Sequence, residues 1–480
     1  MSTMTLIWMA LPLFVGFSIY LLPKLDRVLA LGVGLASLGY GLYAVFATSP
    51  LSLQLIDSFG VTLRVDALSG YFILTNALVT AAVILYCWQS EKSAFFYTQA
   101  IILHGSVNAV FICADFISLY VALEVIGVAA FLLIAYPRSD RAIWVGLRYL
   151  FVSNTAMLFY LIGAVLVYQT NHSFAFEGLQ EAPPEAIALI FLGLLTKGGI
   201  FVSGLWLPLT HAESETPVSA LLSGVVVKTG VFPLLRCALI VPELDPIIRL
   251  FGVATALFGV SYAILAQDTK RVLAFHTISQ LGFILAAPAV GGFYALTHGL
   301  VKAALFLIVG SLPSRNIKAL KQNPMPTSVW VALAIASFSI SGFPLLSGFG
   351  AKILTTKNLL PWQAIGMNIA ALGTAISFAK FIFLPHARQT KDTANPTKPG
   401  FWPAMVVLLG GLVLANGFYY EAYSLANVVK PLLTIAVGWL AYRLIFQKLS
   451  INLSRVAEQF EHLIGAMSLV LIILFWMVMA

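Results

Sequence analysis

Six ionisable side chains lie inside or beside long apolar stretches of the sequence, where they could exchange protons. They are Glu124, Lys197, Lys228, His298, Lys302 and Lys352. A lysine or carboxylate at the centre of a bilayer costs about 2.5–3.5 kcal/mol, so each one needs a partner, a water-filled cavity or a function. Amines and imidazoles held in partly hydrated pockets can bind and release protons. We therefore expect these residues to line a path for protons.

Spacing adds detail to this hypothesis. His298 and Lys302 are four residues apart, which places both side chains on one face of a helix. A carboxylate near an amine favours its charged form, so making and breaking a Glu124–Lys197 pair would load and unload the lysine. Two plainer interpretations stay open: His298 as a hydrogen-bonded core histidine, and Glu124 as a structural partner of Arg148 or a lysine.

The composition indicates which elements must position these residues. Hydrophobic residues make up 60% of the 480 residues and charged residues only 10%, whereas a soluble domain carries about 25% charged residues. The sequence therefore predicts an all-α polytopic membrane protein. The net charge of +8 is explained by basic loops between spans, so we expect a lipid bilayer around the chain and no nucleic-acid partner. The three cysteines are scattered singly, and we expect no metal site and no cofactor.

Apolar runs of about 20 residues, long enough to cross the hydrocarbon layer, recur along nearly the whole chain. We expect about 14–16 transmembrane helices. The sixteen candidate spans are 5–22, 28–47, 68–88, 96–113, 116–136, 143–168, 185–207, 216–241, 247–266, 271–289, 292–312, 327–355, 362–385, 402–419, 425–446 and 462–479. Alternation of apolar and polar residues in 51–55 and 61–65 predicts a small extracytoplasmic hairpin.

Basic residues fall in alternate loops, as they should if every span is real. Lys270 and Arg271 are counted among these topology signals. Under the positive-inside rule the basic loops are cytoplasmic, so both termini are expected to face outward. We expect the membrane to be a bacterial plasma membrane or a thylakoid membrane.

Two spans carry comparable interruptions. Gly198, Gly199 and Pro208 surround Lys197 in one, and Gly342, Pro344, Gly348 and Gly350 precede Lys352 in the other. Paired broken helices in corresponding positions predict an inverted-repeat transporter, here with two five-helix repeats. The expected division is an N-terminal helical region at 1–95, a first half at 96–241, a second half at 242–386 and C-terminal helices at 387–480.

Three longer strings resemble a known family. They are 206–231 (WLPLTHAESETPVSALLSGVVVKTGV), 268–282 (DTKRVLAFHTISQLG) and 295–307 (ALTHGLVKAALFL). Each is similar to a block of the antiporter-like subunits of respiratory complex I, photosynthetic-type NDH-1 and multisubunit Mrp cation/proton antiporters. The resemblance covers about residues 60–385. It assigns Glu124 to the family's fifth-helix glutamate, Lys197 to its broken seventh helix and Lys228 to its eighth.

The same resemblance extends to the second half of the chain. His298 and Lys302 match the family's central histidine and lysine, and Lys352 matches the ionisable group of the broken twelfth helix. A lysine rather than a glutamate at 352 looks like a D-type Mrp subunit or the complex I subunit closest to the redox arm. Arg148 stands where many relatives have lysine, which argues against proton release there because arginine keeps its proton.

The resemblance implies a proton-translocating subunit of a Mrp-type Na⁺/proton antiporter, assembled with other membrane subunits. The alternative is a proton-pumping subunit of an NADH dehydrogenase (NDH-1) or hydrogenase complex; the chain has no motif for redox chemistry of its own. Two further classes stay open. One is a membrane scaffold that lost conduction, and the other is a stand-alone transporter of a small solute.

Overall fold

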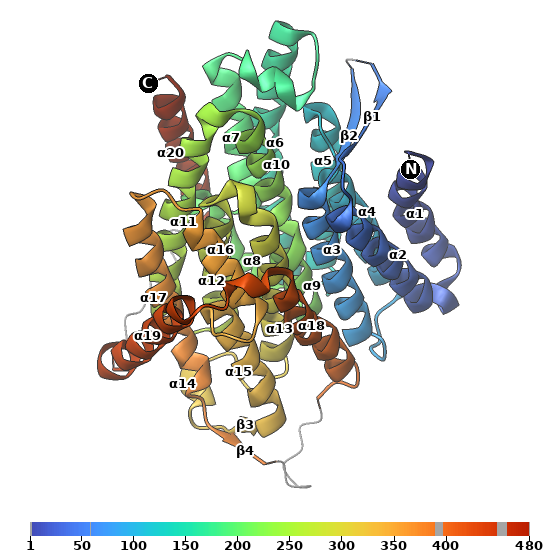
Figure 1. The fold of residues 1–480 in the computed structure, drawn as a ribbon. Helices are drawn as coiled ribbons and strands as arrows, with labels where there is room; N and C mark the ends of the chain where they lie inside the picture. The colour runs from blue at the N-terminus through green and yellow to red at the C-terminus, as the bar shows by residue number, and fades with distance from the viewer. Residues whose placement is uncertain (1, 58, 389–396, 449–457, 480) are drawn as a thin grey trace.

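Helices account for most of the computed structural model, which describes residues 2–57, 59–388, 397–448 and 458–479 (Figure 1). Within these ranges, thirteen helical segments are long and apolar enough to cross a membrane. Three further predicted spans are shorter or interrupted: α4 (Ala94–Val110), α12 (Thr269–Leu285) and the pair α15 (Thr327–Ser341) and α16 (Ser347–Lys357). Each of the sixteen predicted spans is therefore helical, and the chain is an integral membrane protein.

The N-terminal region contains three helices and one hairpin. The helices are α1 (Ser2–Leu21), α2 (Asp26–Phe46) and α3 (Ala67–Tyr86), and the antiparallel hairpin is formed by β1 (Leu51–Ile56) and β2 (Gly60–Val65). Asp66 caps α3 by accepting a hydrogen bond from the Ser69 backbone N–H. Its carboxylate also pairs with the buried Arg236 guanidinium at 2.5 and 2.7 Å. The predicted hairpin is thus confirmed, and an ion pair joins it to a distant helix.

The central ten spans form two sets of five. The first set begins with α4, α5 (Phe116–Ile134) and α6 (Asp140–Asn171). Its fourth span is broken and consists of α7 (Pro184–Gly198), η3 (Phe201–Trp206) and α8 (Leu207–Glu213). Its fifth span is continuous and consists of α9 (Thr216–Leu221), η4 (Leu222–Val226) and α10 (Lys228–Ile240). The second contains α11 (Asp245–Leu265), α12, α13 (Gly291–Val309), α15 with α16, and α17 (Gln363–Ile382).

The fourth span of each set is broken at a glycine. The residue that caps the C-terminus of α7 is Gly199, with φ +69°, and the one that caps α15 is Gly342, with φ +85°. This left-handed conformation strains residues with a Cβ atom but not glycine. Equivalent spans of the two sets are five spans apart. Because the chain reverses direction at each crossing, equivalent spans run in opposite directions, and the two breaks approach the middle of the molecule from opposite ends. The predicted pair of broken helices is confirmed.

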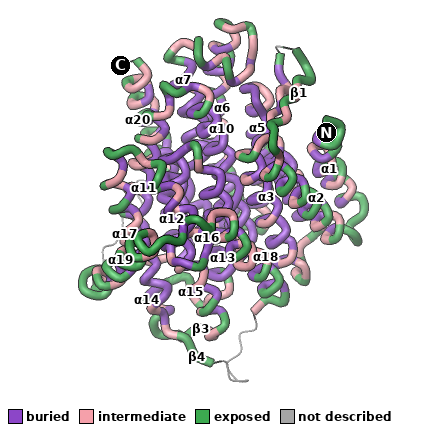
Figure 2. The backbone as a smooth tube through the Cα atoms, in the orientation of Figure 1, coloured by how far each residue is buried: buried purple, intermediate pink, exposed green. Residues whose placement is uncertain are grey.

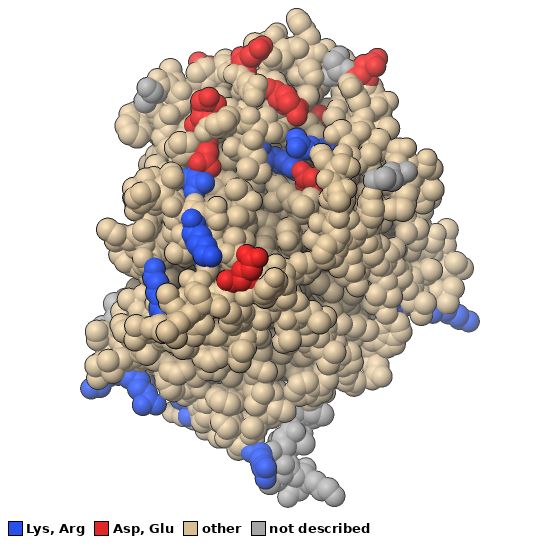
Figure 3. All heavy atoms as spheres, viewed as in Figure 1, with Lys and Arg blue, Asp and Glu red and all other residues tan. Residues whose placement is uncertain are grey.

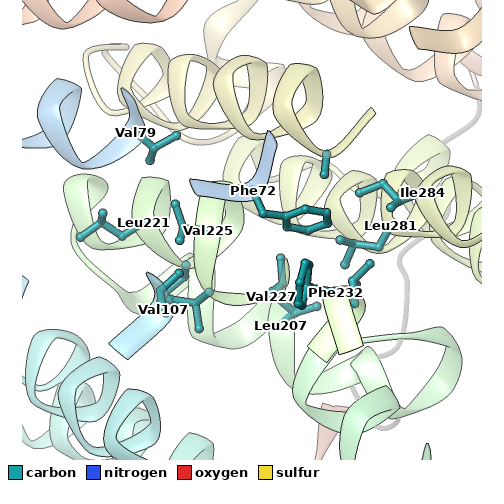
Figure 4. Packing of buried hydrophobic residues seen from close by; sticks show 14 of the residues in the cluster. Phe72, Val79, Val107, Leu207, Leu221, Val225, Val227, Phe232, Leu281 and Ile284 are labelled. Atoms are coloured by element: carbon teal, nitrogen blue, oxygen red, sulfur yellow. The ribbon is translucent and has the colours of Figure 1, made fainter. Parts of the chain in front are cut away.

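Central helices are buried on all sides, whereas outer helices keep an exposed apolar face. The apolar windows of Thr216–Ile240 and Pro288–Val309 are fully buried, compared with 17% of the window in Leu425–Phe446 (Figure 2). Phe72 of α3, Phe232 of α10 and Leu281 of α12 belong to one buried cluster (Figure 4). The rings of Phe72 and Phe232 lie 5.1 Å apart. An apolar core therefore encloses the inner helices and excludes bulk water.

Charged side chains are unevenly distributed on one face of the molecule. On the face drawn in Figure 3, most acidic side chains lie in the upper half, together with some basic ones, and the charged side chains visible at its lower end are basic. The short parallel bridge of β3 (Met325–Pro326) and β4 (His386–Ala387) lies at this lower, basic end. Both termini lie in the upper half of Figure 1.

Two basic residues predicted as topology signals are also buried. Lys270 is buried, and its Nζ donates to the Ser214 carbonyl at 2.6 Å. Arg271 is buried as well and pairs with Glu458. Both follow the cap residue Asp268 in the first turn of α12, where neighbouring segments cover them. Tertiary packing therefore gives these charges specific partners.

The C-terminal region adds α18 (Phe401–Ala415), η8 (Asn416–Ala422), α19 (Leu425–Ala441), η9 (Tyr442–Phe446) and α20 (Phe460–Met479). α20 packs on α7 and η3, beside the break. Just before it, both oxygens of the Glu458 carboxylate accept from Arg271, one of them at 2.8 Å. The Glu458 carbonyl accepts from Arg148 of α6. One residue thus connects the C-terminal helix to both sets of five spans.

Glu458→Ala is expected to destabilise the protein, because it leaves the buried Arg271 charge without its carboxylate. Removing one partner of a buried ion pair costs about 3–5 kcal/mol. The measurement is the thermal unfolding midpoint in detergent. The control is Glu461→Ala, which removes an exposed carboxylate from the first turn of α20 and should leave the midpoint nearly unchanged. Equal midpoints for both variants would contradict a stabilising role for Glu458.

Candidate functional site: a buried line of amines

Lys197 lies at the last turn of α7, directly before the break. Its side chain is 2% exposed, and Nζ donates to the Ser153 hydroxyl at 2.6 Å and to the Leu123 carbonyl at 3.0 Å. A Cβ atom on Gly127 would lie 3.3 Å from this nitrogen, so glycine leaves room for the amine. The Trp206 indole donates to the Thr196 carbonyl at 2.9 Å and ties η3 back to α7.

Glu124 lies on α5 one residue after Leu123, but no ion pair between described residues joins it to Lys197. Its side chain is partly buried, and one carboxylate oxygen has no hydrogen-bond partner in the described part of the chain. Lys197 thus contacts neutral acceptors next to the glutamate. This geometry corresponds to an open pair, and the predicted exchange between open and closed pairs stays a prediction.

Lys228 is fully buried at the start of α10, directly after the π-helical turn η4. Its Nζ donates to the Ser223 carbonyl at 3.2 Å. A Cβ atom on Gly299 would lie 3.5 Å from its Cε atom. The Lys228 side chain therefore lies against α13 at Gly299, next to His298 in the chain.

Lys302 is fully buried in the middle of α13, with Nζ donating to the Leu273 carbonyl of α12 at 2.5 Å. The same ammonium lies 5.2 Å from the centre of the Phe306 ring. His298 is 2% exposed, and neither of its ring nitrogens has a hydrogen-bond partner among the described residues. A buried imidazole without a partner is costly unless water or a transferable proton satisfies it.

Lys352 extends from α16, beyond the second break, towards the centre of the protein. A Cβ atom on Gly342 would lie 2.8 Å from its Cδ atom, so the glycine turn also makes space for this side chain. Its Nζ is buried, has no hydrogen-bond partner in the described residues and lies 5.4 Å from the Phe283 ring centre. With His298, Gln280 and Tyr294 it lines a cavity of about 10 Å³, which is room for about one water molecule.

Lys228 and Lys302 are connected through a pair of hydroxyl groups. Ser223, whose carbonyl accepts from Lys228, contacts Thr277 through the two hydroxyl oxygens at 2.7 Å. The Thr277 hydroxyl donates to the Leu273 carbonyl at 3.0 Å, and the same carbonyl accepts from Lys302. A polar connection thus runs from α10 through α12 to α13.

The structure brings Lys228, His298, Lys302 and Lys352 together on adjoining helices, and it places Glu124 and Lys197 at the first break. Sequence reasoning missed Ser153, whose hydroxyl accepts from Lys197, and the hydroxyls of Ser223 and Thr277, which link the acceptors of Lys228 and Lys302. Buried hydroxyl residues within apolar spans are the signal that could have indicated them. In the described residues, no three His, Cys, Asp or Glu side chains come together as a possible metal site.

A protein-family comparison agrees with this architecture. The profile described as NADH:quinone oxidoreductase/Mrp antiporter, TM matches residues 113–377, more than half of the chain. The chain belongs to this family. The matched region contains both broken spans and all six predicted site residues, while α1–α3 and α18–α20 lie outside it.

Curated relatives of this family member carry two kinds of name. The D-type subunit of the Na(+)/H(+) antiporter of Alkalihalophilus pseudofirmus is 26% identical over 402 residues, covering 76% of this chain and 81% of the relative. NAD(P)H-quinone oxidoreductase chain 4-2 of Synechocystis is 29% identical, covering 77% and 75%. The N-type subunit of the NADH-quinone oxidoreductase of Desulforudis audaxviator is 28% identical, covering 93% and 97%.

Solved structures share the fold. The Mrp complex from Dietzia contains a chain that matches with a TM-score of 0.78 at 23% identity, covering 95% of this family member and 58% of that chain. A chain of the archaeal membrane-bound sulfane sulfur reductase matches with a TM-score of 0.75 at 20% identity, covering 91% and 99%. At these identities the likeness concerns the fold.

Proposed function

We propose that this chain is a proton-translocating membrane subunit of a multisubunit Mrp-type Na⁺/proton antiporter. The observation that carries the proposal is the set of buried amines at and between two broken helices, in a chain of the antiporter family. Protons pass from the Glu124–Lys197 pair to Lys228, then by way of His298 and Lys302 to Lys352. Each amine can hold or release one proton, and neighbouring carbonyl and hydroxyl acceptors stabilise the charged forms of Lys197, Lys228 and Lys302.

We infer the membrane orientation from the basic loops. The basic ends of the helices face the cytoplasm under the positive-inside rule, so the hairpin β1–β2 and both termini face outward. The membrane is a bacterial plasma membrane or a thylakoid membrane. The partners are other membrane subunits, and the coupled ions are protons and Na⁺.

A second candidate is a proton-pumping subunit of an NADH dehydrogenase or hydrogenase-type complex. The relatives named as quinone oxidoreductase chains favour it, and the N-type relative matches over 93% of this chain. In that assembly the same line of amines would be driven by redox chemistry in other subunits. The amines serve both candidates equally, so the driving reaction must be measured.

The experiment uses membrane vesicles that contain the assembled complex and a fluorescent indicator of internal pH. Our proposal predicts that added Na⁺ collapses a preformed proton gradient, with small membrane proteins copurifying. Gradient formation upon oxidation of NADH or hydrogen, with copurifying iron–sulfur proteins and no response to Na⁺, would establish the second candidate instead.

A further inference from the structure

The inner face of α17 carries a polar stripe that the proposed line of amines does not use. Thr374, Ser377 and Lys380 follow one another at intervals of three residues, which places them on one face of the helix. Thr374 and Ser377 have no exposed surface, and Lys380 is 4% exposed. A buried lysine at the end of such a stripe needs a partner or a function.

Thr374, at one end of the stripe, is hydrogen-bonded to a residue that lines the cavity near Lys352. The Tyr294 hydroxyl donates to the Gln280 side-chain oxygen at 2.7 Å, and the Gln280 amide donates to the Thr374 hydroxyl at 3.3 Å. Tyr294 and Gln280 line the cavity that also contains His298 and Lys352. The stripe therefore begins at the proposed proton path.

The middle of the stripe contacts a histidine close to Lys302. The Ser377 hydroxyl is hydrogen-bonded to Nε2 of His276, while Nδ1 of that ring has no partner among the described residues. His276 lies one turn from Leu273, whose carbonyl accepts from Lys302. The imidazole is also near enough to Lys302 and Lys380 to interact electrostatically with both.

The lower part of the stripe ends at the basic end of the molecule. Lys380 donates to the Ala263 carbonyl at 3.2 Å and to the Ala266 carbonyl at 2.7 Å, at the C-terminus of α11. α17 ends two residues later, shortly before β4 (Figure 1). Lys380 is thus the last buried amine before the surface on this side.

We propose that Lys380, Ser377 and His276 form a second branch that conducts protons between the basic face and Lys302. This inference rests on the proposed function and adds a point of proton access to the second set of spans. For each proton that moves from the basic face towards Lys302, Lys380 releases one proton to the Ser377 oxygen. Ser377 gives its own hydroxyl proton to His276, and His276 passes one on to the neutral Lys302 amine. Lys380 then regains a proton from the basic face.

The alternative role for Lys380 is a helix cap, because cationic side chains also stabilise the free carbonyls at a helix C-terminus. Arginine separates the two roles. It keeps the positive charge and can donate to both carbonyls, but it does not release a proton in proteins. A cap therefore tolerates arginine, whereas a proton carrier does not.

The test compares Lys380→Arg with Lys270→Arg in vesicles containing the assembled complex. Lys270 is the matched control: it is also buried at the basic end and donates to a carbonyl, but it lies away from α17. We expect Lys380→Arg to lower the initial rate of ion-driven proton movement by about tenfold or more. Lys270→Arg should keep most of the rate at equal amounts of complex.

Ser377→Ala provides a second variant. If the Lys380→Arg complex does not assemble, Ser377→Ala alone decides whether the branch exists. It removes the hydroxyl that is hydrogen-bonded to His276, and we expect a several-fold lower rate. Its control is Ser261→Ala, which removes an exposed hydroxyl that is bonded within α11. Normal rates in Ser377→Ala and Lys380→Arg, or equal losses in Lys380→Arg and Lys270→Arg, would overturn the branch. If Lys302→Met still conducts, the proposed function itself fails.

Discussion

Lys302→Met is expected to reduce ion-driven proton movement by about 100-fold or more, the range typical of losing a positioned proton-transfer group. Lys302 is fully buried where the connection from Lys228 reaches α13. Every proton that crosses between the two sets of spans must use this amine, in the proposed path and in the α17 branch. Methionine has a similar length and no charge, so it replaces the side chain without leaving a buried charge unpaired.

The measurement is the initial rate of pH change in vesicles, normalised to the amount of assembled complex. Lys357→Met is the control, because Lys357 is exposed on α16 and bonds to the Tyr419 hydroxyl outside the buried line. It should conduct at nearly the normal rate. A Lys302→Met complex that conducts as well as the control would exclude a path through the centre of the protein.

Lys197→Ala should likewise remove nearly all proton movement. The amine stands at the first helix break, bonded to Ser153 and next to Glu124, and no other described lysine lies at this position. Without it, protons have no carrier between α5 and Lys228. The same assay measures the effect, and size-exclusion chromatography of the purified complex checks assembly.

Ser153→Ala tests the surroundings of Lys197 at the first helix break with a smaller change. It removes the hydroxyl that accepts from Lys197 but keeps the amine and the Leu123 carbonyl. A hydrogen bond to a charged group contributes about 1.5–3 kcal/mol, so we expect a partial loss of rate. Thr170→Ala is the control, since its hydroxyl bonds within α6 and is exposed. Normal conduction in Lys197→Ala would instead favour a membrane scaffold that has lost its proton path.

Much of the fold could be predicted because it depends on local properties. Span positions follow from apolar length, and the breaks after Lys197 and before Lys352 follow from clustered glycine and proline. The hairpin at 51–65 follows from its alternating pattern. The family resemblance indicated the six candidate residues, and the structure places them on the two sets of five spans.

The contacts of these residues could not be predicted in the same way. Leu123, Ser223 and Leu273 serve the lysines through their backbone carbonyls, which every residue type has. Nothing in the sequence indicates that these three carbonyls accept hydrogen bonds from lysines. Similarly, the Glu458 contact with Arg271 joins positions 187 residues apart, and no local pattern indicates it.

By itself, the sequence determined that this chain crosses a membrane many times and that two spans break near a lysine, since insertion energy and backbone strain depend on neighbouring residues. Only the tertiary structure decided which acceptors hold each amine, that Glu124 and Lys197 stand apart, and that α17 turns Ser377 and Lys380 inward. The physical reason is that hydrogen bonds act over about 3 Å, and such distances between remote segments are set by how whole helices pack.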